Sequence, residues 1–404
     1  MTIANPNWNA QTWLNHGGEL LESDPRLAHR LLGQGLKQSP EEAIGWFNLG
    51  IGLHQRREIE AAVRAYQHCL TLPHDKETDI AARNNLCQDL LLLDRWEEGW
   101  QLYGDRFKRK PGNQPFFLEA FGPSYRGLPP IHKPLLLMSE QGLGDTLQFV
   151  RYALVLQQQG HDVTLLSQPS LVPLLKEQAG LSQVVEQLDV EQEQKRQPLW
   201  MAQMDLAPQI GCSRSNVPLS AGYIKIDPKR CELWKDKIRR CPQRRLIALH
   251  WQGNPHHEQS LYSRGRSMRF EHLLGLKNLD NVEFVSIQKG AGSEQLKRDQ
   301  GLTFIEGQDV VSASMDFQDT AAVIAQCDLV ITSDSSVVHL SGAMGIPSWL
   351  ALRWIPEWRW GLEGNRTPWY KSLQLFRQPC DGDWESVVQD MRREILANQK
   401  AHLF

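Results

Sequence analysis

The chain has 404 residues, which is more than one ordinary hydrophobic core holds, so two or three domains are expected. Its 44 Lys and Arg residues stand against 47 Asp and Glu residues, and the net charge of −3 argues against a broad basic surface for nucleic acid. The seven cysteines show no spacing typical of zinc ligands or a disulfide framework, and no stretch approaches the roughly 18 apolar residues of a membrane span, so we expect a cytoplasmic chain without a membrane span.

Residues 9–108 carry a helical pattern that repeats with a period of 34 residues, for example from Ala28 to Ala62. The middle copy, W-x-x-L-G-x-x-L starting at Trp46, resembles the tetratricopeptide repeat. Stacked helix pairs of this kind share one apolar layer and present a concave surface. We therefore expect residues 1–110 to form tetratricopeptide-like repeats, with an ordinary helical bundle as the alternative. The repeats would bind a macromolecular acceptor or a protein partner, or would mainly pack against the C-terminal region.

A stretch rich in Pro, Gly and aromatic residues, 111–134, is expected to be a linker. Beyond it, short apolar runs alternate with amphipathic stretches, which predicts parallel strands joined by crossover helices. The expected strands are LLLM (135–138), DVTLL (162–166), VVEQL (184–188), RLIALHW (245–251), VEFVSI (282–287), LTFIE (302–306), DLVIT (328–332) and SWLAL (348–352). Helices are expected near 145–158, 170–179 and 229–240. The pattern predicts two Rossmann-like domains, 135–242 and 243–404, that face one cleft.

Polar residues follow the first expected strand, in the order S-E-Q-G-L-G-D-T. Gly142 and Gly144 allow a tight turn and leave room for a ligand, and Asp145 begins a helix. Asp145 also has an ordinary alternative role, because an acidic side chain in the first turn of a helix caps free N–H groups.

A second polar cluster, H-W-Q-G-N-P at 250–255, ends another strand and is followed by Arg264 and Arg266. Guanidinium groups suit phosphate oxygens, so a diphosphate contact is predicted here, with Gln252 beside it. A solvated loop with incidental arginines is the alternative. Gln288 and Lys289, at the end of the next strand, are further candidates for nucleotide contacts.

The segment T-S-D-S-S lies between the strand DLVIT and the expected helix V-V-H-L-S-G-A-M-G. A helix N-terminus attracts a diphosphate through its dipole and unpaired N–H groups, and Ser335 and Ser336 add hydroxyls. His339, one helical turn after Ser335, is placed to donate to a phosphate oxygen, unless it is a buried histidine satisfied by its neighbours. Asp334 would repel phosphate, so we expect it to cap the helix or to meet a sugar hydroxyl.

The block R-W-I-P-E-W-R-W-G-L-E-G-N-R-T-P-W-Y, residues 353–370, combines aromatic rings with charged side chains. Such rings suit stacking on a sugar or a nucleobase, so Trp358 and Arg359 are candidates for the acceptor or donor-sugar loop. The alternative is that the tryptophans lock an irregular loop onto the core.

Together these blocks resemble bacterial tetratricopeptide-repeat proteins with a C-terminal region of glycosyltransferase family nine, the heptosyltransferase-like group with the GT-B fold. The resemblance rests on E-Q-G-L-G-D-T-L-Q-F-V-R-Y (140–152), H-W-Q-G-N-P (250–255), D-F-Q-D-T-A-A-V-I-A (316–325), the stretch 328–347, and P-E-W-R-W with P-W-Y and L-F-R-Q (356–378). It implies an α + α/β chain, with helical repeats followed by two Rossmann-like domains. The first of these domains would hold the acceptor and the second the nucleotide-sugar donor.

The same resemblance implies sugar transfer from a nucleotide-diphosphate sugar to a protein or glycan acceptor, with inversion at the anomeric carbon and without metal or cofactor. Asp145 matches the position of the general base, and Asp334, Ser335, Ser336 and His339 match the D-[ST]-x-x-x-H donor segment. Glu357 departs from the more usual P-D-W-R-W, which leaves the choice of donor sugar open. A non-catalytic repeat scaffold that binds nucleotide-sugar and a nucleotide-sugar epimerase are alternatives.

Overall fold

The computed structural model describes residues 8–109, 120–238, 241, 243–259, 262–296 and 301–400. The chain divides into two compact units. Unit 1 consists of Met1–Phe116 together with the short segment Glu357–Leu362, and unit 2 consists of Phe117–Pro356 and Glu363–Phe404. Of the expected linker, residues 111–119 lie outside the described residues.

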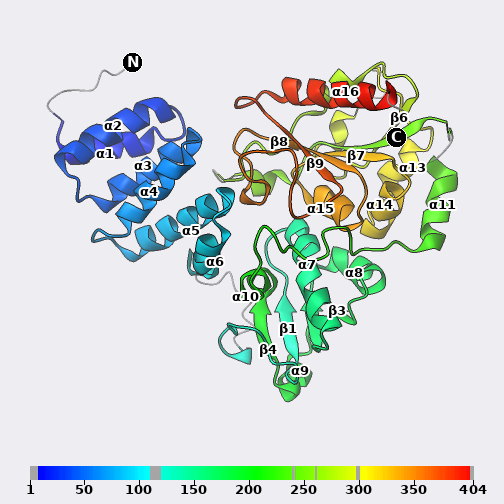
Figure 1. The fold of residues 1–404 in the computed structure, drawn as a ribbon, viewed down its shortest axis with the longest axis horizontal. Coiled ribbons are helices and arrows are strands. Elements are labelled where there is room, and N and C mark those ends of the chain that lie inside the picture. Colours follow the sequence, from blue (N-terminus) through cyan, green and yellow to red (C-terminus); the bar gives the residue numbers. More distant parts are fainter. Residues whose placement is uncertain are drawn as a thin grey trace. The chain divides into compact units, whose positions relative to one another are not determined.

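Unit 1 is built from helical hairpins, drawn in blue in Figure 1. Its helices are α1 (Ala10–Glu19), α2 (Pro25–Gln38), α3 (Ala43–Gln55), α4 (Ile59–Cys69), α5 (Lys76–Leu92) and α6 (Trp96–Tyr103), followed by the 3-10 turn η1 (Gly104–Arg109). Helices α1 and α2, α3 and α4, and α5 and α6 pack as pairs, and each pair contacts the next. A Cβ atom on Gly50 would lie 2.4 Å from the ring of Tyr66, so glycine at this position lets α3 approach α4.

The first sheet of unit 2 has four parallel strands in the order β3-β2-β1-β4. Its strands are β1 (Leu135–Met138), β2 (Val163–Leu166), β3 (Gln183–Val185) and β4 (Leu199–Ala202), and its connections contain α7 (Leu143–Gln158), η3 (Pro169–Leu171), α8 (Val172–Gln178), α9 (Val190–Arg196), η4 (Gln203–Asp205) and α10 (Leu206–Gln209). Helix α11 (Pro228–Ile238) leads to the second sheet.

The second sheet has five parallel strands in the order β6-β5-β7-β8-β9. Its strands are β5 (Arg245–His250), β6 (Val282–Ser286), β7 (Leu329–Ser333), β8 (Ser348–Leu352) and β9 (Leu373–Arg377). The connections contain η5 (Pro255–Glu258), α12 (Phe270–Leu273), η6 (Leu274–Leu276), η7 (Ser293–Gln295), α13 (Gln308–Ala313), α14 (Phe317–Ile324), α15 (Ser336–Ala343) and η8 (Trp358–Trp360), and α16 (Trp384–Lys400) ends the unit. Trp384, Val388 and Met391 of α16 bury one face of this sheet, where they join Ile247 and Leu249 of β5 in one apolar cluster.

The expected strand at 302–306 is wrong, because only Phe304 forms a bridge, with Phe284 of β6. Backbone hydrogen bonds join Phe284 to Thr303 and Ile305, and the chain then turns into α13. Strands β4 and β9 were not expected. The helix expected at 229–240 is present as α11, and residues 239 and 240 lie outside the described part.

The order of the strands reverses between β1 and β4 in the first sheet and between β5 and β7 in the second. Ligands of open parallel sheets bind beyond the carboxyl ends of strands at such reversals. The polar clusters after β1, β5 and β7 all lie at these ends.

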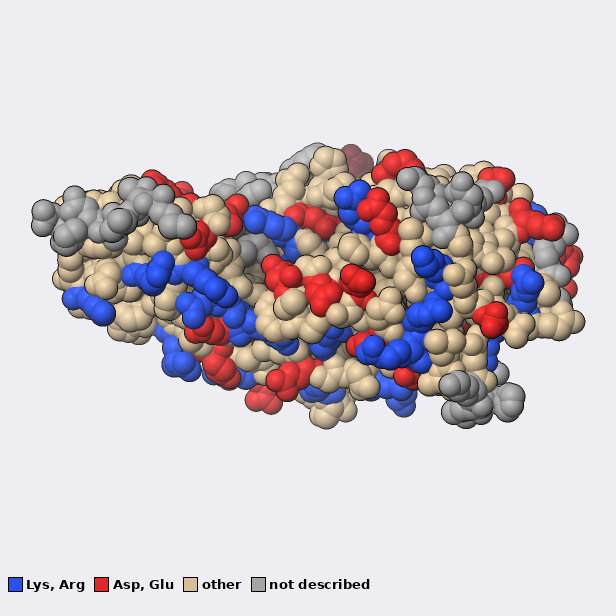
Figure 2. All heavy atoms as spheres, turned by 90° about the horizontal axis from the view of Figure 1, so that it is seen from above, with Lys and Arg blue, Asp and Glu red and all other residues tan. Residues whose placement is uncertain are grey.

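No helix among the described residues is both long and apolar enough to cross a bilayer. On the face drawn in Figure 2, basic and acidic side chains are interspersed, in keeping with the small net charge of −3.

Candidate functional site

The first turn of α7 packs against α15, so segments from the two sheets of unit 2 meet at this point. A Cβ atom on Gly144 would lie 2.7 Å from Cδ2 of His339 and 3.4 Å from Cα of Ser336. The shorter distance is a steric clash, so only glycine lets the two helices come this close. Three residues predicted from two distant parts of the sequence are therefore neighbours.

Asp145 occupies the third position of α7, and its carboxylate caps the helix. The backbone N–H of Gly142 donates to Oδ2 of Asp145 over 2.8 Å, and the Asp145 side chain is half-buried. Gln141, just before this cap, has a φ of 61°, which is unfavourable for a residue with a side chain and marks a tight turn. The capping role that the sequence left open is thus present, and the role of general base stays a prediction.

Ser335 caps α15 with a hydroxyl group. Its Oγ accepts a hydrogen bond from the N–H of Val337 over 3.3 Å and lies 3.2 Å from Nδ1 of His250, the last residue of β5. Burial lowers the pKa of His250 to about 3, because a buried site disfavours the charged imidazolium. The imidazole is therefore neutral at physiological pH, and this contact links the two strands that flank the reversal in strand order.

Asp334 lies between β7 and the cap of α15, and its side chain is only 8% exposed. No described residue donates a hydrogen bond to its carboxylate or forms an ion pair with it. The neighbouring Ser333 is fully buried, and its hydroxyl also has no partner within the described part of the chain. Because Ser335 provides the cap, Asp334 does not have the predicted capping role. Contact with a sugar hydroxyl stays a prediction.

His339 is buried on α15, and Nδ1 of its ring lies 3.0 Å from the hydroxyl of Tyr370. The ring of Tyr370 fits over Gly342, where a Cβ atom would lie 2.5 Å from it. Burial raises the pKa of Tyr370 well above its usual value, so its hydroxyl keeps its proton. The Cδ2–Nε2 edge of His339 lies toward Gly144. The buried histidine thus contacts Tyr370 through one ring edge, and its other edge is turned toward the start of α7.

Arg151 of α7 ties the two sheets together from a fully buried position. Its Nη1 donates to the carbonyl oxygen of Trp369 over 2.8 Å and to that of Pro218 over 3.3 Å. Its guanidinium also lies over the rings of Tyr223 and Tyr370, at 4.9 and 4.7 Å from their centroids. This network fixes α7, which carries Asp145, relative to the segment that holds His339 in place.

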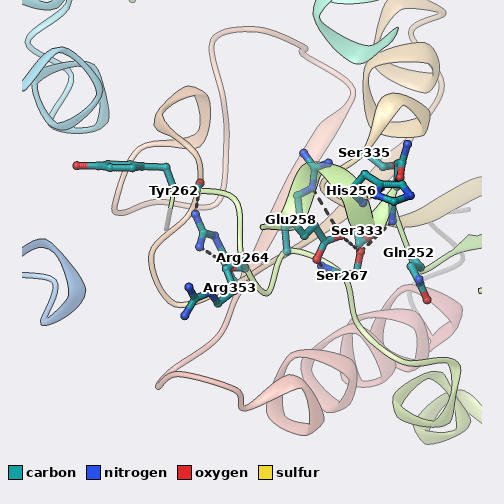
Figure 3. Close-up of polar contacts among 12 residues, drawn as sticks. Gln252, His256, Glu258, Tyr262, Arg264, Ser267, Ser333, Ser335 and Arg353 are labelled. Carbon is teal, nitrogen blue, oxygen red and sulfur yellow. Dashed lines mark hydrogen bonds and ion pairs between the residues drawn. The ribbon is translucent and has the colours of Figure 1, made fainter. Parts of the chain in front are cut away.

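The loop after β5 is held by a polar network around Glu258, drawn in Figure 3. The hydroxyl and the N–H of Ser267 donate to Glu258, and the N–H of Gly253 donates to the Ser267 hydroxyl over 2.9 Å. Nε of Arg266 lies 3.7 Å from Oε1 of Glu258. The predicted diphosphate contact Arg266 thus has a carboxylate neighbour that the sequence did not single out.

Arg264 is exposed on the same loop, and its backbone is held by Arg353. The guanidinium of Arg353 donates to the carbonyl oxygens of Arg264 and Tyr262, as Figure 3 shows. Arg353 directly follows β8, so the end of that strand fixes the loop that carries Arg264.

Gln252, Gln288 and Lys289 are engaged by the protein itself. The amide group of Gln288 accepts from the N–H groups of Trp251 and Gln252 and donates to three carbonyl oxygens. Lys289 donates to the Val311 carbonyl, and burial lowers its pKa to about 8. The side chain of Gln252 accepts from that of Gln295 over 2.8 Å. These residues hold the loops after β5 and β6 in place, and their contact with a nucleotide stays a prediction.

Trp358 and Arg359 belong to unit 1, where both side chains are buried. The ring of Trp358 packs at 5.4 Å from that of Trp100 and at 6.1 Å from that of Tyr103. This packing agrees with the alternative that the sequence left open, in which a tryptophan holds an irregular loop in place. Their role in sugar binding stays a prediction.

Two further features bear on what the site can hold. Within the described residues, no group of three His, Cys, Asp or Glu side chains is arranged to hold a metal ion. A cavity of about 780 Å³ lies elsewhere in unit 2, between the end of α7 and residues 219–228, and none of the predicted site residues lines it. The predicted donor and acceptor residues thus lie at the strand ends and not in this cavity.

Residues 281–351 match the family model of glycosyltransferase family 9 (heptosyltransferase). The match spans β6, β7, α15 and most of β8, and so includes Gln288, Lys289 and the predicted donor segment from Asp334 to His339. This match supports a glycosyltransferase enzyme, as the sequence predicted.

Among curated proteins, the chain is similar to protein FlbA of Caulobacter vibrioides, with 25% identity over 375 residues. The alignment covers 88% of this chain and 61% of that protein, so the chain spans about three fifths of the length of this relative.

Two of the similar solved structures illustrate the likeness, and each covers 66% of this chain. One is the ADP-heptose lipopolysaccharide heptosyltransferase II of E. coli, with 10% identity, a TM-score of 0.44 and 99% of that chain covered. The other is a family 9 glycosyl transferase from Veillonella parvula DSM 2008, with 12% identity, a TM-score of 0.46 and 96% of that chain covered.

Proposed function

We propose that the chain is an inverting, metal-independent glycosyltransferase that moves a sugar from a nucleotide-diphosphate sugar to a protein or glycan acceptor. The observation that carries the proposal is the family 9 match over 281–351, whose helix α15 packs against the turn that bears Asp145. The match thus includes the proposed donor segment, and the proposed base lies beside it.

The donor would bind at the carboxyl ends of β5 and β7. The first turn of α15 offers backbone N–H groups and the positive end of a helix dipole to a diphosphate. Ser335 and Ser336 add hydroxyls there, and Arg264 and Arg266 would approach from the loop after β5. His339, held by Tyr370, would donate from its opposite ring edge.

Asp334 and Ser333 support a polar ligand at this point. Burying a carboxylate or a hydroxyl without a hydrogen-bond partner costs free energy, and a ligand that supplies the missing partner recovers it. Both side chains are buried, and neither has such a partner among the described residues. Hydroxyl groups of the donor sugar or ribose would satisfy Asp334 without the repulsion that a phosphate would cause.

In the proposed reaction, the acceptor loses its O–H or N–H proton to the carboxylate of Asp145. The acceptor atom forms a bond to C1 of the donor sugar on the face opposite the diphosphate. The bond between C1 and the diphosphate oxygen breaks, and its electron pair leaves with the nucleoside diphosphate. General-base help of this kind is worth about 10²–10⁴-fold in rate. The arginines, hydroxyls and His339 would stabilise the charge that develops on the leaving group.

Unit 1 would serve as a tetratricopeptide-like surface for a macromolecular acceptor or a partner. Its antiparallel helix pairs, with Gly50 packed under Tyr66, support this proposal. A curved stack of helix pairs suits an extended peptide segment better than a small sugar.

The donor is testable by thermal shift with UDP-, GDP-, dTDP- and ADP-sugars. A ligand that binds only the folded chain stabilises it by about 2.7 kcal/mol at one hundred times Kd. We expect one nucleotide class to produce such a shift and to be slowly hydrolysed by the chain alone. If none of the four raises the melting temperature, the donor assignment is wrong, and binding without hydrolysis or transfer would favour the scaffold alternative.

Inversion and metal independence each have a direct check. The anomeric configuration of the product, read from NMR coupling constants, should be opposite to that of the donor. Activity should persist in EDTA. Retention of configuration, or loss of activity that added Mg²⁺ or Mn²⁺ restores, would contradict the respective part of the proposal.

A further inference from the structure

Glu258 carries a carboxylate on the loop after β5, within unit 2, and its side chain is only 15% exposed. Both of its oxygens accept hydrogen bonds from Ser267. The hydroxyl of Ser267 donates to Oε1 and its N–H donates to Oε2 over 3.4 Å (Figure 3). The same hydroxyl accepts from the N–H of Gly253 over 2.9 Å. Neutral groups of the loop therefore fix the carboxylate in place.

Arg266 is the cation that pairs with this carboxylate within the described part of the chain. Its Nε lies 3.7 Å from Oε1 of Glu258, which is close enough for an ion pair. This Nε is nevertheless buried without a hydrogen-bond partner among the described residues. Burying a charged donor without a hydrogen bond costs free energy. The guanidinium is thus attracted to Glu258, but its hydrogen-bonding capacity is not satisfied there.

The ion pair lies next to the carboxyl end of β5. A Cβ atom on Gly253 would lie 3.6 Å from Nη2 of Arg266 and 3.6 Å from Oε1 of Glu258, so both charged groups adjoin the backbone just after this strand. Strand β5 pairs with β7, and its last residue, His250, contacts the hydroxyl of Ser335 at 3.2 Å. The pair therefore adjoins the strand ends that we propose for the diphosphate.

We propose that Glu258 competes with the donor diphosphate for Arg266, and that it thereby favours release of the nucleoside diphosphate after transfer. Without donor, Glu258 holds the guanidinium. A diphosphate displaces it, because phosphate oxygens accept hydrogen bonds from the guanidinium fork that Glu258 leaves unsatisfied. When the nucleoside diphosphate leaves, Glu258, still bound to Ser267, pairs with the guanidinium again.

Glu258 is in this sense a positioning residue that acts through Arg266. Its hold on Arg266 stands on the contacts above, whereas its effect on release rests on the proposed function. A carboxylate that only prepares Arg266 for the diphosphate has the opposite consequence, because its loss weakens the binding of the anion. The sign of the change in affinity therefore distinguishes the two roles.

Glu258→Gln tests this sign in the full-length chain, with inorganic pyrophosphate as the probe and calorimetry as the measurement. The amide oxygen of Gln still accepts from the Ser267 hydroxyl, so the substitution removes the charge and keeps the loop. We expect the Kd of pyrophosphate to fall by about tenfold, because the charge of Arg266 is then wholly available to the anion. An unchanged or higher Kd would overturn the proposal.

Glu283→Gln is the matched control. Glu283 lies near the start of β6, its side chain is 13% exposed, and its Oε1 lies 3.6 Å from Nη1 of Arg244. It is thus a carboxylate of similar burial and pairing at the other end of the strands. This variant should keep the wild-type Kd, and equal tightening in the two variants would show an effect of net charge alone.

A double-mutant cycle shows whether Glu258 acts through Arg266. In an Arg266→Ala background, adding Glu258→Gln should change the Kd of pyrophosphate by less than about twofold, because the group for which the two anions compete is gone. The same tightening with and without Arg266 would mean that the carboxylate repels the anion directly, which would refute competition for Arg266.

Modification by phenylglyoxal, followed by mass spectrometry, tests the hold on Arg266 without a phosphate ligand. Arg266 should react about threefold faster in Glu258→Gln than in the wild type, since the ion pair no longer restrains it, while Arg264 keeps its rate. Equal rates at Arg266 would contradict the hold. If the wild type binds neither pyrophosphate nor a nucleotide sugar, the proposed function fails together with the role in release, and the modification rate still decides whether Glu258 holds Arg266.

Discussion

Helices α7 and α15 both begin just beyond a parallel strand, and their first turns touch, but groups of different charge cap them. The carboxylate of Asp145 caps α7, and the hydroxyl of Ser335 caps α15. A carboxylate offsets the positive end of the helix dipole, whereas a hydroxyl leaves that end available to an anion. The same local geometry therefore favours a proton acceptor on one side of the contact and a diphosphate on the other.

Asp145→Asn removes the charge difference with the least change in structure, because the amide oxygen of Asn can still accept the hydrogen bond from the N–H of Gly142. We expect transfer to fall by about 10²–10⁴-fold, since the amide cannot accept the proton of the acceptor. Donor binding should be unchanged, because the proposed donor segment lies on the other helix. Transfer rates at saturating donor and thermal shifts on the same samples check both statements. Full activity with normal donor binding would remove Asp145 as the base.

Gly144→Ala drives the two helices apart. The added Cβ atom would lie 2.7 Å from His339, so the contact must open at a cost of about 1–3 kcal/mol. Displacement of the reacting groups should lower transfer by about 100-fold. Urea unfolding and transfer rates measure the two effects.

Gly33→Ala is the control for this substitution, because no atom lies within 4 Å of a Cβ placed there in α2. It should stabilise the chain by up to about 1 kcal/mol through helix propensity and leave transfer unchanged. Equal losses of transfer in the two variants would show that the α7–α15 contact has no special importance.

Tyr370→Phe tests whether the orientation of His339 on α15 matters for transfer. Without the hydroxyl at 3.0 Å from Nδ1, His339 loses a hydrogen-bond partner that helps to orient its ring. We expect kcat to fall by about tenfold, equivalent to one hydrogen bond of about 1.4 kcal/mol, with KM for the donor nearly unchanged. Tyr152→Phe removes an equally buried hydroxyl, which contacts Sγ of Cys212 at 2.9 Å, and should keep full activity. Similar kcat values in the two variants would contradict a positioning role for Tyr370.

The smallest expected effect is a decrease in the free energy of unfolding at acidic pH. An unperturbed imidazole titrates near 6.5, whereas burial lowers the pKa of His250 to about 3. Between these values the unfolded chain binds a proton that the folded chain does not, so the free energy of unfolding falls as pH drops below 6.5. The slope from this residue is about 1.4 kcal/mol per pH unit. Above pH 6.5 the contribution is constant.

Urea unfolding at several pH values between 4.5 and 7.5 measures this slope. His250→Gln should unfold with a shallower dependence on pH than the wild type, because the variant lacks the titrating group. His256→Gln changes an exposed histidine of the following loop and should keep the wild-type slope. Identical slopes in all three proteins would mean that His250 is not neutral in the folded chain.

Strands β1 and β7 could be predicted because their apolar runs are continuous and end in polar residues, which is typical of buried parallel strands. Strands β4 and β9 could not, because L-W-M-A follows a polar stretch and L-Q-L-F-R alternates. Their conformation depends on pairing with β1 and β8, which are distant in sequence. The stretch 302–306 has the composition of a strand but pairs only at Phe304.

The candidate site, too, could be predicted from the sequence only in part. The sequence located Gly144, Asp145 and His339 through their motifs, and the fold brings their helices into contact. It could not show that backbone groups of two loops occupy the hydrogen-bonding positions of the Gln288 amide. Some of these partners follow β5, about 36 residues earlier in the chain. Nor could it show that Trp358 packs on Trp100, because no periodicity connects positions so far apart.

Arg151 connects the two sheets of unit 2, and its contacts determine how this connection responds to pH. Burial alone would lower its pKa, but interactions with Tyr223 and Tyr370 raise it above the ordinary value. No described carboxylate forms an ion pair with it, and its partners are carbonyl groups, the hydroxyl of Tyr223 and aromatic rings. Backbone carbonyl groups do not titrate, and the guanidinium of an arginine keeps its charge in proteins. The connection between the two sheets through Arg151 therefore does not depend on pH. Mild acid should lower the free energy of unfolding through His250 before it changes the position of one sheet relative to the other.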